Sequence, residues 1–406
     1  MPYANPRVSK SLLSPEDSAP WHLLDAGGIT TREFAAALHR IVPTVCWQPD
    51  YRWFPLFRPR PSTEWLADPL LQLQRFPVQR GYSRPLIGRL AGFAERTAAL
   101  LARSASAQSP LVCTSCFYAP VAARWPGPVI YYLTDLAAAY DHLNARQVMA
   151  LDRAMCAVAA LVCPNSRRLA AYLMETAGCD PGKLAILPNA TRQSSLRKAS
   201  FGAPAESPAD LAGLPRPWAG VIGNLAGNLD WELIERSMAL APAISWVFVG
   251  PISMKIAARS QSEARRRVQR NRGQARFVGF QPYGVLHRYA RAFDVAVMPY
   301  HRHEPTFSGS ATRFYEHLAA GPPMLATRGV EELTRKEPLL RLVDSAEQLA
   351  QELSRLQPNG FRDGFEEARW LASQSETWDA RARDMVQSFQ ARQGAPEMAR
   401  SSAMAS

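Results

Sequence analysis

The segment with the clearest chemical character spans residues 294–333, where an apolar run leads through a polar loop into a helical pattern. A loop rich in serine and glycine that opens a helix presents free backbone N–H groups and the positive end of the helix dipole, which suits a diphosphate. Arg313, near that end, could add a bidentate charge. Glu316 offers only acceptor oxygens, which could hold the two hydroxyls of a ribose. Taken singly, these residues also fit an ordinary helix start with surface charges.

Other polar residues expected around a bound nucleotide come from two predicted strand-to-helix loops, and they are Tyr300, Ser308, Gly309, Ser310, Thr312, Asn224 and Asn228. Asp230 lies in the same stretch as the two asparagines. It is predicted to cap the helix that starts at Trp231 rather than to bind a ligand.

A second catalytic candidate is Asp135, at the carboxyl end of the apolar run 129–135. A carboxylate within about 3 Å of a hydroxyl can take its proton as a general base. The alternative is that Asp135 caps the following loop or helix. Asp25, Gly27 and Gly28 end the first predicted strand and open the first helix, where the glycines permit either close approach to a sugar or diphosphate or simply a tight turn.

No residue pattern favours a metal site or a cofactor. His301 and His303 flank a turn beside Glu304, but residues on one loop define no geometry, and we expect exposed side chains near the nucleotide. Cys113 and Cys116 have CxxC spacing without a second pair or a nearby histidine, so a zinc site is not expected. All six cysteines are interpreted as small buried hydrophobes in a reducing compartment.

The elements that must position these side chains alternate short apolar strands with amphipathic helices, which predicts βα repeats and parallel sheets. In the first half, strands are predicted at 21–25, 44–48, 111–115, 129–135, 160–166 and 184–189, with helices at about 31–41, 86–103, 142–158 and 167–177. In the second half, strands are predicted at 219–224, 245–251, 276–280, 294–300, 323–328 and 340–344, with helices at about 230–240, 254–270, 284–292, 311–320 and 346–356.

This pattern predicts an α/β chain of two Rossmann-like domains that face each other across a cleft. The predicted sequence of parts is a disordered tail at 1–20, a first domain at 21–200, a Pro/Ala/Gly-rich linker at 201–217, a second domain at 218–362, a final helix at 363–391 and a disordered tail at 392–406. Ligands of open α/β sheets bind beyond the carboxyl ends of the strands, so the cleft is the expected site.

Charge gives a competing interpretation. The 406 residues carry a net charge of +12, and all but five of the 47 basic residues are arginine. The run 257–276 is especially basic, which suggests either a solvated helix face or nucleic-acid binding with steep salt dependence. Nucleic acid is not the expected partner, because the chain shows no aromatic-plus-basic RNA module and no helix-turn-helix spacing.

Membrane contact is a separate question. No apolar stretch approaches the length that spans a bilayer, and the first residues lack the apolar core of a signal peptide, so a soluble cytoplasmic chain is expected. Residues 47–61 mix aromatic side chains with arginines. This composition suits peripheral contact with an anionic membrane surface beside a lipid-linked acceptor, or else packing under a long loop.

Residues 294–333 resemble the nucleotide-binding signature of GT-B glycosyltransferases, especially the bacterial family 4-like enzymes. The pattern Lys/Arg-x-x-Glu-x-x-Ala-Ala-Gly-x-Pro is matched by Arg313, Glu316, Ala319, Ala320, Gly321 and Pro323. Segments 161–191, 220–234, 246–251 and 276–300 resemble further landmarks of that family, so the resemblance covers roughly residues 110–390.

The resemblance implies a hexosyltransferase-type enzyme of glycan, polysaccharide or glycolipid biosynthesis. The second domain would bind a nucleoside-diphosphate-sugar, the first domain a hydroxyl acceptor, and no metal would be needed at the diphosphate. The last helix would cross back to the first domain. Asp135 stands where some related enzymes that invert the anomeric configuration carry a general base.

Two positions depart from the family pattern. Ser308 stands where retaining members commonly carry a glutamate, and Asn189-Ala190 stands where Asn-Gly is usual. A hydroxyl cannot supply the charge of a carboxylate. A GT-B sugar-nucleotide epimerase is another alternative, although it would need more carboxylates in the cleft.

Overall fold

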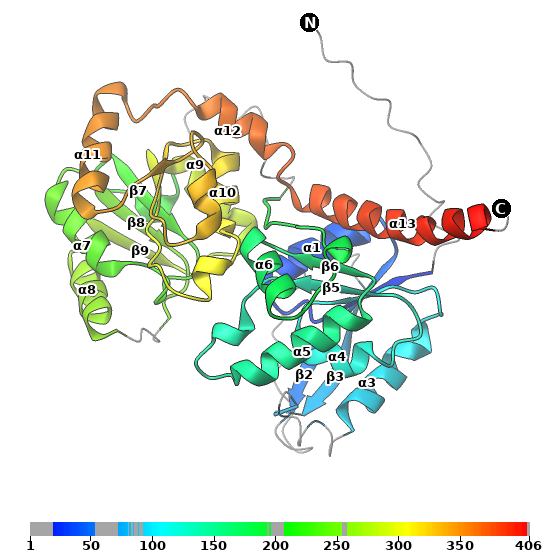
Figure 1. Cartoon of the computed structure of the whole chain (residues 1–406). Helices are drawn as coiled ribbons and strands as arrows, with labels where there is room; N and C mark the ends of the chain where they lie inside the picture. Colours follow the sequence, from blue (N-terminus) through cyan, green and yellow to red (C-terminus); the bar gives the residue numbers. More distant parts are fainter. Residues whose placement is uncertain are drawn as a thin grey trace, which may run out of the picture.

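The first domain is built on a parallel six-stranded sheet with helices on its faces (Figure 1). The computed structural model describes residues 19–52, 72–79, 81–82, 84, 88, 92–192, 195, 207–253 and 258–403. In spatial order the strands are β3 (Gln72–Gln79), β2 (Thr44–Arg52), β1 (Trp21–Leu24), β4 (Leu111–Cys113), β5 (Val129–Leu133) and β6 (Leu161–Pro164). The helices include α1 (Ile29–His39), α3 (Phe93–Leu101), α4 (Ala119–Ala122), α5 (Ala145–Val158) and α6 (Arg167–Glu175).

The second domain repeats this architecture. Its parallel sheet has the order β12 (Arg341–Leu342), β11 (Met324–Ala326), β10 (Val295–Met298), β7 (Trp218–Ile222), β8 (Ser245–Val249) and β9 (Ala275–Gly279). The helices are α7 (Trp231–Leu240), α8 (Arg259–Arg270), α9 (Leu286–Ala292), α10 (Thr312–Ala320) and α11 (Ala346–Leu356). Both sheets reverse strand order beside their first strand, which is the Rossmann-like arrangement predicted from the sequence.

Five of the six strands predicted for the first sheet are present, and the sixth differs. Residues 184–189 make only one isolated bridge, between Val162 and Leu184. The place at the sheet edge is taken instead by β3, whose sequence QLQRFPVQ buries Phe76 and Val78 and leaves polar side chains outward. A proline inside a strand is typical of an edge, and this mixed composition hides the strand from an apolar-run search.

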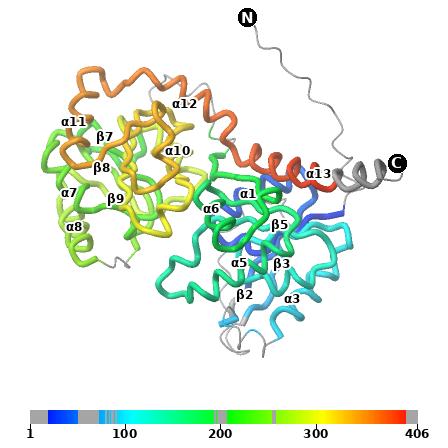
Figure 2. The backbone as a smooth tube through the Cα atoms, in the orientation of Figure 1, coloured from blue at the N-terminus to red at the C-terminus, as the bar shows by residue number. Residues whose placement is uncertain are grey.

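The predicted final helix is two helices, α12 (Glu366–Ser373) and α13 (Trp378–Ala403), and α13 crosses back to the first domain (Figure 2). It packs against α1, and its Phe389 ring meets the ring of Trp21 in β1 edge to face with centroids 5.3 Å apart. Arg40 also pairs with Asp379 at 2.6 Å. The helix continues to Ala403, where the sequence predicted a tail from residue 392.

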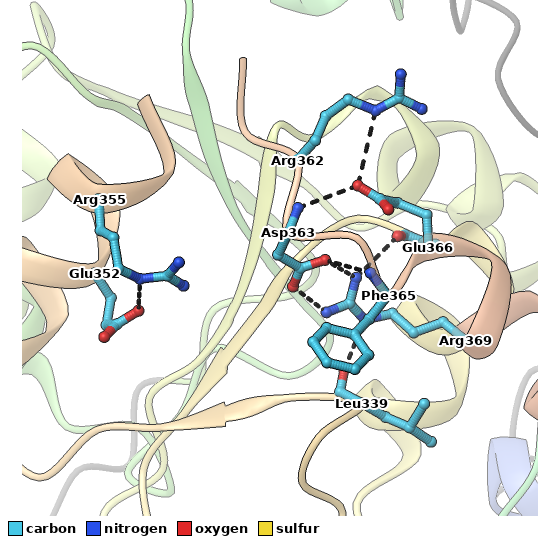
Figure 3. Close-up of polar contacts among 9 residues, drawn as sticks. Leu339, Glu352, Arg355, Arg362, Asp363, Phe365, Glu366 and Arg369 are labelled. Carbon is cyan, nitrogen blue, oxygen red and sulfur yellow. Dashed lines mark hydrogen bonds and ion pairs between the residues drawn. The ribbon is translucent and has the colours of Figure 1, made fainter. Parts of the chain in front are cut away.

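Helix α12 is held on the second domain by Arg369, whose side chain is only 1% exposed (Figure 3). Its Nη1 donates to Asp363 Oδ1 at 2.9 Å, and its Nη2 donates to the other carboxylate oxygen. The same guanidinium donates to the Leu339 carbonyl at 2.6 Å and, at 3.4 Å, to the Gly321 carbonyl that follows α10. One buried cation therefore fixes the start of the returning segment to the second domain.

The basic run 257–276 falls largely on α8, whose arginines are divided between packing and ion pairs. Arg265 is buried and donates to the Ser253 carbonyl. Arg267 pairs with Glu235 on α7, with Nη2 to Oε2 at 2.8 Å, and Arg259 pairs with Glu263. This is the arrangement of a helix with a solvated charged face.

Parts of several segments discussed in the sequence analysis lie outside the residues that the structure describes. Trp47 in β2 is buried and donates through Nε1 to His22 Nδ1 at 2.9 Å. Residues 53–61 of the aromatic and basic stretch lie outside the described residues, as do 1–18 and 201–206.

All six cysteines are free and buried. Within the described ranges, none of the helices combines the length and apolarity needed to span a bilayer.

Candidate functional site

A cavity of about 450 Å³ lies between the two domains. Its walls come from loops that follow the carboxyl ends of strands in both sheets, the position expected for a ligand of open α/β sheets. The residues of the first domain that line it are Ile29, Thr30, Thr134, Asp135, Asn165 and Asn189. Opposite them, the second domain contributes the loops after β7, β8, β9 and β10 and the start of α10.

Direct contacts between the domains border this cavity. Ser166 Oγ donates to the Ser308 carbonyl at 2.5 Å. The Asn189 side chain donates through Nδ2 to the Ser310 carbonyl at 2.8 Å and to Thr312 Oγ1 at 2.9 Å. The loop that opens α10 is therefore held against the first domain by hydrogen bonds rather than only by van der Waals contact.

Arg313 lines the cavity from the first turn of α10. It is 6% exposed, and its guanidinium donates through Nε to the Ile222 carbonyl and through Nη2 to the Asn224 carbonyl at 2.5 Å. Its Cζ also lies 4.9 Å from the centre of the Tyr300 ring. Among the described residues, the remaining nitrogen Nη1 has no partner. Arg313 thus fixes the loop after β7 and supplies the one cationic side chain of the described cavity lining.

The start of α10 supplies further donors. The backbone N–H groups of Ser310, Thr312 and Arg313 have no acceptor in the described part of the chain, whereas Ala311 N–H is taken by Glu332 Oε2 at 2.9 Å. Gly309, Ser310 and Thr312, which were predicted to lie around a nucleotide, line the cavity. Free N–H groups at a helix start attract anions because they add to the positive end of the helix dipole.

Ser308 was expected beside these residues but lies outside the cavity lining. It is buried, its Oγ donates to Glu304 Oε1 at 2.8 Å, and its N–H donates to Glu304 Oε2 at 3.2 Å. Glu304 in turn lies 3.7 Å from Arg168 of the first domain. Ser308 therefore anchors the loop, and its side chain is not available to a ligand in this arrangement.

Glu316 lies one helical turn beyond Arg313 and lines the same cavity. Its Oε1 accepts from the Tyr283 hydroxyl and, at 3.5 Å, from Thr191 Oγ1. Burial raises the pKa of this carboxyl to about 7, although the Tyr283 hydrogen bond and the charge of Arg192 act in the opposite direction. Oε2 accepts no hydrogen bond from any described residue. One carboxylate oxygen thus remains for a ligand hydroxyl.

Asp135 lines the cavity from the end of β5, across from α10. The residue as a whole is exposed, but the neighbouring loops partly desolvate its carboxylate, which raises the pKa of this group to about 6. No described residue donates a hydrogen bond to this carboxylate. The helix cap considered from the sequence is not formed: the helical turn Ala137–Ala139 starts after Leu136 without a side-chain cap, and Asn144 caps α5.

Asn224, Asn228 and Tyr300 also line the cavity, at the ends of β7 and β10. Tyr300 is buried, with its ring under the Arg313 guanidinium. Asp230 caps α7 through Oδ1, which accepts from Leu233 N–H at 3.0 Å, so this sequence prediction is confirmed.

The loop after β1 contributes differently from expectation. Asp25, with φ +71°, accepts from the Tyr118 hydroxyl at 2.9 Å and from Gly27 N–H at 3.2 Å, and burial raises its pKa. Neither Asp25, Gly27 nor Gly28 lines the cavity. The next two residues, Ile29 and Thr30, which begin α1, do so. Asp25 therefore shapes the loop that brings its neighbours to the cavity.

His301 and His303 have ring centroids 6.2 Å apart on the loop after β10. Throughout the described ranges, no group of three or more histidine, cysteine, aspartate or glutamate side chains has the arrangement of a metal site.

Other cavity residues were not predicted from the sequence to contact a ligand, and they include Thr134, Asn165, Asn189, Phe280, Gln281 and Tyr283. Thr134, Asn165, Asn189 and Phe280 are the last or next-to-last residues of predicted strands, and Gln281 and Tyr283 follow one. Their position at the end of a strand was the signal available, although it does not separate a lining residue from its neighbours.

Comparison with known proteins gives a consistent picture of the fold. No protein-family model and no curated protein matches the sequence. Anabaena HepE in complex with UDP and glucose is similar at 15% identity and a TM-score of 0.70, with 92% of this chain and 100% of that chain covered.

Two further solved structures are similar over nearly their full length. Sucrose-phosphate synthase from Thermosynechococcus elongatus shares 18% identity over 93% of this chain and 99% of that chain, with a TM-score of 0.65. A UDP-forming α,α-trehalose-phosphate synthase from Burkholderia vietnamiensis shares 15% identity over 92% and 97%, also with a TM-score of 0.65. With its two Rossmann-like sheets, interdomain cavity and returning helix, the chain has the GT-B fold of these glycosyltransferases.

Proposed function

We propose that this protein is a glycosyltransferase that moves a sugar from a nucleoside-diphosphate-sugar to a hydroxyl acceptor. The observation that carries the proposal is the content of one interdomain cavity. Arg313, the free N–H groups of α10 and Glu316 line its second-domain side, and Asp135 lines the opposite side. The proposal assigns an anion site, a ribose acceptor and a candidate base to this one cavity.

The donor diphosphate would bind at the start of α10. Backbone donors of Ser310, Thr312 and Arg313 would contact its oxygens, and the Arg313 guanidinium would offset the charge that develops on the leaving diphosphate. Because these groups supply the positive potential, the proposal requires no metal ion or other cofactor. Glu316 would accept a ribose hydroxyl through its free Oε2, while Tyr283 and Thr191 hold the other oxygen.

Asp135 would take the proton of the acceptor hydroxyl. In that step the acceptor oxygen forms a bond to the anomeric carbon, the bond from that carbon to the diphosphate breaks, and the proton passes to the carboxylate. A pKa of about 6 suits this role, because the group is ionised at neutral pH and still basic enough to hold a proton. Attack opposite to the leaving diphosphate inverts the anomeric configuration.

The finer assignments extend this proposal. HepE is solved with UDP and with glucose, so a uridine donor carrying a hexose is the first candidate. A glycan or lipid-linked acceptor, and hence polysaccharide or glycolipid biosynthesis, agrees with the aromatic and basic composition of residues 47–61, in whose described part only Trp47 is buried. That segment would contact an anionic membrane on its cytoplasmic side.

Thermal-shift measurements with UDP, GDP, ADP and TDP test the core of the proposal. One nucleotide should stabilise the protein clearly, by about 2.7 kcal/mol at a concentration one hundred times its Kd. Inorganic phosphate at the same ionic strength serves as the control. A protein that responds to none of the four nucleotides would not be a nucleoside-diphosphate-sugar transferase. If one nucleotide does stabilise the protein, NMR of the reaction product would report the anomeric configuration.

A further inference from the structure

Three asparagine side chains in the described part of the chain have a buried amide oxygen without any hydrogen-bond partner, and they are Asn165, Asn189 and Asn228. All three line the interdomain cavity. An acceptor buried without a partner costs about 1–3 kcal/mol, so such groups are uncommon and each calls for an explanation. Their concentration at one cavity indicates that a ligand supplies the missing donors.

Two of the three amides have a fixed orientation. Asn165 Nδ2 donates to the Thr134 carbonyl at 2.8 Å, and Asn189 Nδ2 donates to the Ser310 carbonyl at 2.8 Å. Turning either amide over would place its oxygen against a carbonyl oxygen, which repels it. The unpartnered atom is therefore the oxygen in both residues, and each needs a donor.

The chemistry of the missing partner follows from this. Sugar hydroxyls donate hydrogen bonds to amide oxygens, whereas ionised phosphate and carboxylate groups have no proton to donate. Among the described lining residues of the first domain there is no cationic side chain, and the single charge is the carboxylate of Asp135. This wall of the cavity therefore favours an uncharged polyhydroxyl group.

The positions of the asparagines place that group. Asn165 follows β6 and lies beside the end of β5, since its N–H donates to the Leu133 carbonyl at 2.9 Å, so it neighbours Asp135. Asn228 belongs to the opposite domain, in the loop after β7. A sugar attached to a diphosphate at the start of α10 would lie between these two walls.

We propose, building on the glycosyltransferase function above, that the transferred sugar is a neutral polyol and that Asn165 Oδ1 accepts a hydrogen bond from one of its hydroxyls. Asn228 would do the same from the second domain. The amide oxygens would thus select an uncharged sugar over a uronic acid or a phosphorylated sugar, because an anionic group would meet acceptors and the Asp135 carboxylate.

Calorimetry on the full chain tests this with UDP, GDP, ADP and TDP, each alone and as its glucose conjugate. The informative quantity is the Kd of the nucleotide divided by the Kd of its glucose conjugate, because this ratio measures what the sugar adds to binding. Asn165→Ala should lower that ratio about tenfold, equivalent to about 1.4 kcal/mol, and leave the Kd of the nucleotide alone within about twofold. Asn359→Ala, the same change at an exposed position outside the cavity, should leave both quantities unchanged.

Asn228→Ala repeats the test from the opposite wall and decides the matter if Asn165→Ala does not fold. In the wild type, the glucuronate conjugate should bind at least about tenfold more weakly than the glucose conjugate. An unchanged ratio in the folded variants would overturn the inference while nucleotide binding by the wild type preserved the proposed function. An equal loss for nucleotide and conjugate would assign the amide to the nucleotide and also overturn it. If no nucleotide binds the wild type, the function itself fails.

Discussion

Replacement of Arg313 by alanine separates the two tasks that the structure gives to this side chain. The guanidinium holds the loop after β7 through the Ile222 and Asn224 carbonyls, and it provides the one cationic side chain of the described cavity lining. Arg313→Ala therefore removes an anion contact and also leaves two carbonyls without their donor. Because the donor is charged, stability should fall by about 1.5–3 kcal/mol for each hydrogen bond lost.

The same substitution should also weaken nucleotide binding. A hydrogen bond from a charged donor contributes about 1.5–3 kcal/mol, and solvent screens it little because Arg313 is 6% exposed. The Kd for the stabilising nucleoside diphosphate should therefore rise between about tenfold and 150-fold. Arg313→Lys keeps the charge without the planar fork, so its loss should be intermediate.

Isothermal calorimetry at a temperature where both variants are folded measures this change. Arg328→Ala is the matched control, since Arg328 is half exposed, pairs with Asp344 and lies outside the cavity lining. The control should bind nucleotide with a Kd within about twofold of the wild type. A folded Arg313→Ala variant with unchanged affinity would remove Arg313 from the binding site and refute the reasoning.

Three further predictions concern other residues. Asp135→Asn should lower turnover at least about 100-fold with donor Kd unchanged, and the wild-type rate should fall as pH drops below about 6, where the carboxylate gains its proton; normal turnover would show that Asp135 is not the base. Because Glu316 has a pKa raised from 4.5 to about 7, its contribution to stability is complete below pH 4.5 and is lost as pH rises through 7, so Glu316→Gln should flatten urea-unfolding stability over this range; an unchanged pH dependence would contradict the burial argument. Arg369→Ala should cost about 3–5 kcal/mol in urea unfolding because it leaves the largely buried Asp363 carboxylate without its cation and removes the donor to the Leu339 and Gly321 carbonyls, whereas Arg362→Ala, at an exposed arginine, should cost less than about 1 kcal/mol; equal costs would mean that the Arg369–Asp363 pair does not anchor α12.

The sheets were largely predictable because most of their strands are fully buried. Strands covered by helices on both faces form continuous apolar runs, such as VIYYL in β5 and SWVFV in β8. The edge strand β3 has only one buried face and contains Pro77, so its polar residues conceal it. Residues 184–189 mislead in the opposite way, since an apolar composition alone does not provide a partner strand.

For the site, the rule that ligands bind beyond the carboxyl ends of the strands predicted that Asp135, Arg313 and Glu316 would face the cleft, and all three line one cavity. It could not predict side-chain direction. Ser308 turns to Glu304 and Asp25 turns to Tyr118, and both contacts depend on the detailed course of the chain. The orientation of the Asn189 amide depends on Ser310, which is 121 residues away in sequence and in the other domain. Contacts of this kind follow from the docking of two domains rather than from local pattern.

The returning chain passes from one domain to the other beside the outgoing chain. Thr191 forms a parallel bridge with Thr377, and Trp378 N–H donates to the Thr191 carbonyl at 3.0 Å. Arg369 fixes the segment before this point to one domain, and the contact of α13 with α1 fixes the segment after it to the other. If the two domains rotate relative to each other, residues 374–377 and the neighbouring Thr191 would be their common hinge. A rotation about these residues would separate the Asn189 amide from the start of α10 and widen the cavity between the domains, while each domain kept its own core intact.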